Sequence, residues 1–149
     1  MHFRYKLFTG KTPSVSLRGR FSRPRPVVTI SLLGPAKTYP TQALLDTGAD
    51  ETIFPEIASR AAGIDLANAP AGATTGIGAA VVPVRYVEVP LRISDGKESR
   101  EWLAWVGFTP LPLTRPLLGF AGFLQFFTTT FHGDREEVFL EINALYRGT

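Results

Sequence analysis

The sequence contains no cysteine and only two histidines, His2 and His132. Without cysteine the chain can form no disulfide, no thiolate metal site and no cysteine nucleophile. The histidines do not have the spacing of a metal-ligand pair, and no Gly-x-Ser-x-Gly segment is present. We therefore expect no metal, no cofactor and no histidine-based triad. Any hydrolytic chemistry would have to use carboxylates.

The chain also lacks a long apolar run. No stretch reaches the roughly 18–20 residues that span a bilayer. Residues 1–8 alternate apolar and basic side chains, so they contain no continuous apolar region of the kind found in signal peptides. These observations predict no membrane segment and a cytoplasmic location.

Acidic residues are missing from the first 45 positions. That stretch carries eight lysines and arginines, whereas all thirteen acids lie beyond it. A basic segment can bind nucleic acid or another anionic partner, but the aromatic residues of a single-strand platform are sparse here. We favour a solvated basic arm over residues 1–24, followed by a domain over residues 25–149. Nucleic-acid binding by the arm is the weaker alternative.

What the sequence does contain is typical of one globular domain rich in short strands. The chain has 149 residues, of which 44% are hydrophobic, and it has 14 glycines and 12 prolines. Alternating and β-branched runs predict strands at residues 3–7, 27–33, 43–45, 52–54, 81–93, 101–108, 126–131 and 138–142. Trp102 and Trp105 both lie in one of these strands, and we expect both in the core.

Other segments predict a helix and loops. Residues 55–63 form the clearest helix, with Pro55 at its first position and Gly63 just past its end. Residues 9–25 are rich in glycine, proline, serine and arginine and are interpreted as a loop, with at most a short strand at 15–17.

A glycine-rich segment at residues 72–80 could suggest a dinucleotide-binding turn. That turn needs an apolar strand before it and a helix after it. Here an Ala-Pro-rich segment precedes it and an extended run follows it. We therefore interpret the segment as a β-hairpin whose tip is Gly76-Ile77-Gly78.

The chain is organised around residues 43–50, Ala-Leu-Leu-Asp-Thr-Gly-Ala-Asp. The apolar run before Asp46 predicts a buried strand with a carboxylate at its end, and Gly48 allows a sharp turn. Burial of even a neutral polar group without a partner costs roughly 2–7 kcal/mol, so the carboxylate needs donors. Backbone N–H groups, the Thr47 hydroxyl or a second carboxyl could supply them. Alternatively, Asp46 could simply cap the turn, because Asp-Thr-Gly is a common turn tripeptide.

Three motifs follow one another along the chain: the apolar run into Asp46–Ala49, then residues 76–78, then Leu117-Leu118-Gly119. Together they resemble the retropepsin-type aspartic proteases, the single-lobe relatives of pepsin, over about residues 25–142. The resemblance implies an all-β fold: a closed barrel-like lobe with a flap hairpin and one or two short helices.

The resemblance also implies that Asp46 is the catalytic residue. Aspartic proteases place two such carboxylates on one water, yet this sequence holds a single Asp-Thr-Gly. The active site should therefore form across a two-fold axis in a homodimer. Two neighbouring carboxyls share one proton. The charged one acts as general base on the water, and the protonated one acts as general acid on the peptide carbonyl.

Supporting residues follow from the same resemblance. Thr47 would hydrogen-bond across to its mate, and Gly48 would approach the substrate backbone. The substrate-binding residues implied by the resemblance are Ala49, Asp50, Gly76, Ile77, Gly78 and Leu117.

One position departs from the viral pattern. Viral members carry an arginine directly after the second apolar-apolar-Gly, where it pairs with the acid equivalent to Asp50; this sequence has Phe120. The chain therefore resembles cellular and bacterial single-lobe members more closely. The alternative function is a non-catalytic, monomeric module of the same fold that binds peptides or proteins.

Overall fold

The computed structural model describes residues 1–76 and 79–149 and is built almost entirely from β-strands. The strands and helices in chain order are β1 (His2–Arg4), β2 (Lys6–Ser14), the 3₁₀ turn η1 (Val15–Leu17), β3 (Arg20–Arg25), β4 (Val27–Leu33), β5 (Thr38–Leu45), β6 (Ile53–Pro55), α1 (Glu56–Ala62), β7 (Ala71–Thr75), β8 (Val81–Ser94), β9 (Ser99–Thr109), β10 (Leu117–Leu118), the 3₁₀ turn η2 (Leu124–Phe126), β11 (Phe127–His132) and β12 (Glu137–Ile142). The predicted all-β class is confirmed.

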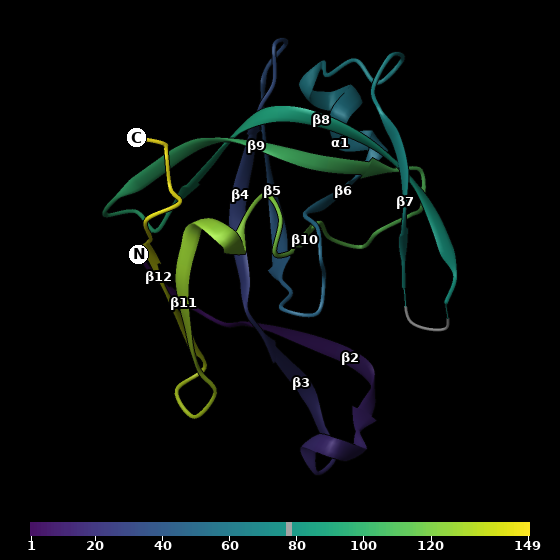
Figure 1. Ribbon diagram of the computed structural model, residues 1–149. Helices are drawn as coiled ribbons and strands as arrows, with labels where there is room; N and C mark the ends of the chain where they lie inside the picture. The colour runs from purple at the N-terminus through teal and green to yellow at the C-terminus, as the bar shows by residue number, and fades with distance from the viewer. Residues whose placement is uncertain (77–78) are drawn as a thin grey trace.

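The main sheet closes on itself to form a barrel. It has seven strands in the order β4-β5-β10-β6-β9-β8-β7, and β4 also pairs with β8. The last residues of β8 pair with β4, whereas its first residues pair with β7. The β7–β8 hairpin therefore projects from the closed part of the sheet, as Figure 1 shows. The hairpin predicted over residues 72–80 is present, although its tip residues Ile77 and Gly78 lie outside the described residues.

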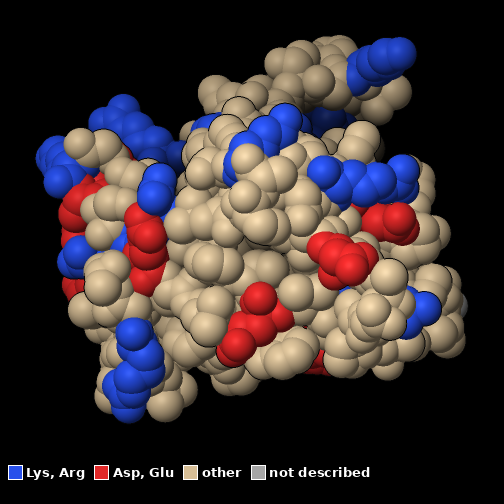
Figure 2. All heavy atoms as spheres, turned by 90° about the horizontal axis from the view of Figure 1, so that it is seen from above, with Lys and Arg blue, Asp and Glu red and all other residues tan. Residues whose placement is uncertain are grey.

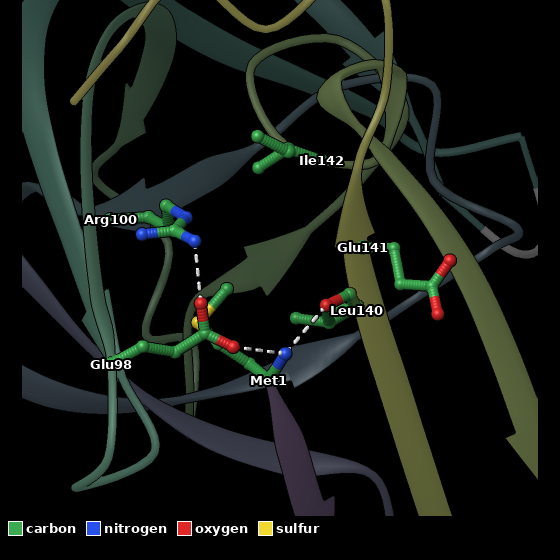
Figure 3. Close-up of a pocket in the computed structure, with 6 residues that line it drawn as sticks. All are labelled: Met1, Glu98, Arg100, Leu140, Glu141 and Ile142. Carbon is green, nitrogen blue, oxygen red and sulfur yellow. Dashed lines mark hydrogen bonds and ion pairs between the residues drawn. The ribbon is translucent and has the colours of Figure 1, made fainter.

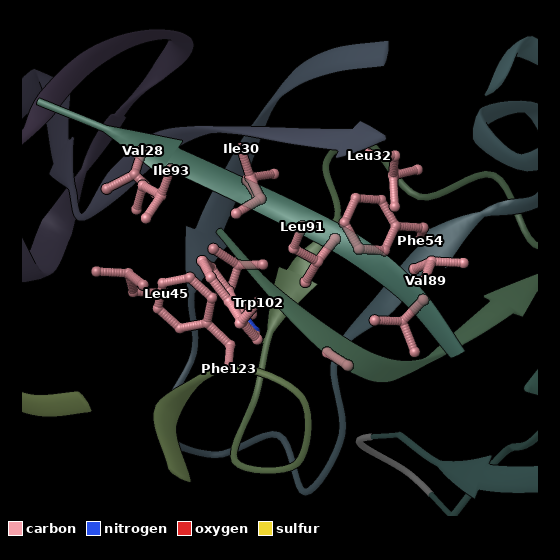
Figure 4. Close-up of a cluster of buried hydrophobic side chains, with 14 of the residues drawn as sticks. Val28, Ile30, Leu32, Leu45, Phe54, Val89, Leu91, Ile93, Trp102 and Phe123 are labelled. Atoms are coloured by element: carbon pink, nitrogen blue, oxygen red, sulfur yellow. The ribbon is translucent and has the colours of Figure 1, made fainter. Parts of the chain in front are cut away.

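The core fills this barrel with side chains from alternate strand positions (Figure 4). In β4, for example, Val28, Ile30 and Leu32 are buried, because successive side chains of a strand point to opposite faces. The same alternation corrects one prediction. Trp102 is buried, but Trp105, three positions along β9, is 54% exposed. An odd spacing in a strand places the two rings on opposite faces.

Helix α1 differs from its prediction only at its start. Pro55 is the last residue of β6 and precedes the helix, with ψ at 144°, instead of occupying the first helical position. Gly63 ends the helix at φ 76°, in the left-handed region that favours glycine.

The loop predicted over residues 9–25 is wrong. β2 and β3 form an antiparallel hairpin there, and residues 15–17 form a 3₁₀ turn instead of a strand. The glycine and proline content indicated a loop, but the strand pairing accommodates these residues. Pro24 pairs with Leu7, and the pairing is irregular between Thr9 and Ser14. Figure 1 shows this hairpin projecting away from the barrel.

A smaller sheet, in the order β1-β12-β11, lies beside the barrel. Its first strand is held by the amino group of Met1, which donates to the Leu140 carbonyl at 2.8 Å. The same amino group lies 2.8 Å from Glu98, whose other oxygen accepts from Arg100 at 2.6 Å (Figure 3). This ion pairing lowers the pKa of Glu98 below its ordinary value.

The face opposite the β2–β3 hairpin carries both basic and acidic side chains. Figure 2 shows lysines and arginines interspersed with acids over a largely uncharged surface. Among the helices of residues 1–76 and 79–149, none has the length and apolar character required to cross a membrane.

The turn between β8 and β9 contains an acid that should affect stability at low pH. The carboxylate of Asp95 accepts from the N–H groups of Glu98, His2 and Lys97, at 3.0, 2.9 and 2.9 Å, and these donors hold its pKa well below its ordinary value. The ionised form therefore stabilises the fold above the unfolded pKa of about 4, and this contribution is lost as pH falls further.

We therefore expect Asp95→Asn to lose less stability than the wild type between about pH 6 and pH 3, because one linked protonation is removed. Urea unfolding at each pH measures this difference. Asp134→Asn, in the exposed turn between β11 and β12, is the control. Parallel pH profiles for the wild type and Asp95→Asn would contradict the assignment.

Candidate active site

Asp46 lies immediately after β5, at the point where the chain leaves the barrel wall. β5 buries Ala43 and Leu45, and the next residue carries the half-buried carboxylate. Its Oδ1 accepts from the N–H of Gly48 at 3.0 Å. Backbone N–H groups, the Thr47 hydroxyl and a second carboxyl are the donors to Asp46 that the sequence suggests. Within this chain, the donor is a backbone N–H, that of Gly48.

The loop after Asp46 is supported by the segment that follows β10. β10 lies between β5 and β6, so Leu117 pairs with both Leu44 and Ile53. At the end of β10, the Asp46 N–H donates to the Leu118 carbonyl at 3.1 Å. The N–H groups of Phe120 and Ala121 donate to the carbonyls of Ala49 and Asp50, each at 2.9 Å. Backbone hydrogen bonds thus fix the loop at several points.

Gly119 allows the two segments to approach this closely. A Cβ added at Gly119 would lie 2.3 Å from the Glu51 carbonyl oxygen and 2.6 Å from that of Ala49. These are backbone atoms, and they cannot rotate away from the contact. A side chain here must displace the loop that carries Asp46.

We therefore expect Gly119→Ala to lower the free energy of unfolding by about 1–3 kcal/mol, the range for overpacking, and to reduce any activity that depends on Asp46. Gly133→Ala is the matched control, because a Cβ there meets nothing within 4 Å. Equal midpoints in urea for the two variants would show that the segment yields to the added methyl group.

A cavity of about 350 Å³ opens over this loop, between the loop, the β7–β8 hairpin and the segment after β9. Its lining brings together six of the predicted site residues from three parts of the sequence: Asp46, Gly48, Ala49, Asp50, Gly76 and Leu117. Thr47 is exposed on the loop and does not line the cavity. Ile77 and Gly78 lie outside the described residues.

The cavity also has lining residues that the sequence did not suggest: Glu51, Ile53, Thr74, Thr75, Val82, Thr109, Leu111 and Leu113. Most of them come from the strands of the hairpin and from the segment after β9. The two threonines of β7 could have been found from the sequence, because they directly precede the predicted hairpin tip.

Glu51 is the most informative of these residues. The Tyr86 hydroxyl donates to its carboxylate at 2.6 Å. Burial, the hydrogen bond to Glu51 and its charge together raise the pKa of Tyr86 to about 12. Over residues 1–76 and 79–149, no three histidines or acids gather as a group suited to a metal ion.

These features define a class of protein. A closed β-barrel with an Asp-Thr-Gly loop at the end of a buried strand, below a projecting hairpin, is the single-lobe arrangement expected of an aspartic protease. Residues 22–120 match the family model described as retroviral aspartyl protease. This match covers more than half of the chain, which therefore belongs to that family. A search of curated proteins found no match. The predicted closeness to cellular and bacterial members stays a prediction.

Proposed function

We propose that the chain is an aspartic endopeptidase whose active site forms between two copies. One observation carries the proposal: the only Asp-Thr-Gly of the sequence places the Asp46 carboxylate on a cavity of about 350 Å³ between the fixed loop and the hairpin. Family membership points to an aspartic peptidase. A single lobe supplies one Asp-Thr-Gly aspartate, so the second comes from a partner related by two-fold symmetry.

The chemistry follows from pairing two identical acids. Held within hydrogen-bond distance, the two Asp46 carboxyls share one proton, since both cannot ionise cheaply. The ionised carboxylate takes a proton from a water, which attacks the carbonyl carbon of the peptide. The protonated carboxyl donates to the carbonyl oxygen. We expect activity at mildly acidic pH, where the pair retains its shared proton.

The hairpin supplies the other side of the substrate site. Thr74, Thr75 and Gly76 line the cavity opposite the Asp46 loop. An extended peptide lying between them can pair its main chain with strand edges, as in other β-strand recognition modes. Closure of the hairpin over the peptide would exclude bulk water.

The test is cleavage of reduced, alkylated casein between roughly pH 3 and 8, the range in which carboxyl pairs titrate, with and without pepstatin. Cleavage should be blocked by pepstatin, and specific activity should fall on dilution as dimers dissociate. A folded sample that cleaves nothing at any pH would reject the proposal. In that case a monomeric mass in sedimentation would favour the peptide-binding module.

A further inference from the structure

The cavity is acidic beyond what the proposed chemistry requires. Three carboxylates line it, from Asp46, Asp50 and Glu51, and no lysine or arginine is among its described lining residues. Asp46 has the reacting role, so Asp50 and Glu51 remain as a negative surface beside it. Within the described part of the chain, neither of them forms an ion pair.

Glu51 is held in place by contacts on two sides. Its backbone forms a parallel bridge with Ala121 and lies against Gly119. Its Oε2 accepts from the Tyr86 hydroxyl at 2.6 Å. Because the pKa of Tyr86 is raised, this hydroxyl keeps its proton over the whole range in which the protein could work.

A carboxylate accepts at several lone pairs, and one tyrosine hydroxyl occupies only one of them. Glu51 can therefore bind a further donor from a ligand in the cavity. A cationic donor suits it best, because charge-assisted hydrogen bonds are about twice as strong as neutral ones. A glutamate or aspartate brought to the same place would be repelled.

Building on the proposed function, we propose that Glu51 is a specificity-determining residue that selects substrates with a lysine or arginine side chain close to the scissile bond. Tyr86 is its positioning residue. Asp50 adds to the negative charge at this end of the cavity.

The test uses one peptide that the wild type cleaves, taken from the casein digest. Each of the three positions on either side of the scissile bond is replaced in turn by lysine, norleucine or glutamate. At about pH 6 we expect lysine to exceed norleucine in kcat/KM by roughly tenfold at one position or more. Glutamate there should be the poorest of the three.

Variants test whether the preference for lysine depends on Glu51. Glu51→Gln should bring the lysine-to-norleucine ratio close to one, and Glu51→Lys should make glutamate the preferred residue. Tyr86→Phe should lower the ratio mainly through KM, since the carboxylate keeps its charge but loses its fixed orientation. Glu88→Gln, an exposed position of β8 outside the cavity lining, removes the same charge and should leave the ratio unchanged.

The outcomes separate this inference from the proposed function. A wild type that cleaves lysine, norleucine and glutamate peptides equally well would overturn the role of Glu51 but leave the peptidase intact. A preference that persists in Glu51→Gln would also overturn it. Absence of cleavage of every peptide and of casein would reject the proposed function itself.

Discussion

Replacing Asp46 by asparagine is expected to lower the rate of peptide cleavage roughly 10³-fold or more, because the general acid and general base are both lost. The fold should be unaffected. Asparagine keeps a side-chain oxygen that can accept from the Gly48 N–H, the 3.0 Å contact that Asp46 makes within its own loop. Casein cleavage measures the loss of activity, and a urea unfolding curve measures the stability of the fold. Asp134→Asn, outside the cavity lining, serves as the control.

Mixing the wild type with the Asp46→Asn variant tests whether one active site needs two chains. If subunits exchange between dimers, Asp46→Asn chains pair with wild-type chains and form inactive heterodimers. A threefold excess of Asp46→Asn should then leave roughly a quarter of the activity per wild-type chain. Activity that is independent of added mutant would contradict a shared site, as would full activity of Asp46→Asn alone.

Much of the architecture was predictable because local signals and tertiary structure agree. β4 is the run from Val27 to Leu33 that the sequence predicted, bounded by Pro26 and Gly34. The apolar run into Asp46 does end as a buried strand. In these segments the period of the side chains, the turn residues and the buried face all indicate the same structure.

The remainder depends on contacts that no local pattern records. Glu51 and Tyr86 are 35 positions apart, and they meet because the barrel brings the Asp46 loop against β8. The β2–β3 hairpin has the composition of a loop. It forms because the backbones of its two strands pair with each other, despite their prolines. Trp105 is different, because its exposure could have been predicted. We expected both tryptophans in the core, but the odd spacing from Trp102 places Trp105 on the opposite face of β9.

Among the variants considered, Trp102→Ala is expected to lower the free energy of unfolding most, by about 3–5 kcal/mol, the range for deleting a buried tryptophan. Its ring packs against Phe123, Phe127 and Tyr146, with centroids 5.6, 5.3 and 6.2 Å away. Its indole N–H donates to the Gly122 carbonyl at 3.1 Å. The substitution would thus open a cavity and leave a buried acceptor without its donor.

Trp105→Ala is the matched control, because it removes the same side chain from the same strand. Its ring is 54% exposed, so we expect a loss of about 1 kcal/mol or less. Unfolding by urea at one protein concentration, followed by far-ultraviolet circular dichroism, compares the two variants without relying on tryptophan fluorescence. Equal losses would contradict the core position of Trp102.

The same substitution should also affect the candidate active site. Gly122, which Trp102 holds, directly follows Ala121, whose N–H donates to the Asp50 carbonyl and whose carbonyl accepts from Thr52, both at 2.9 Å. Trp102 therefore supports from the core the segment that fixes the Asp46 loop. We expect Trp102→Phe, which keeps an aromatic ring but not the N–H donor, to reduce cleavage more than Trp105→Phe does under conditions where both variants are fully folded.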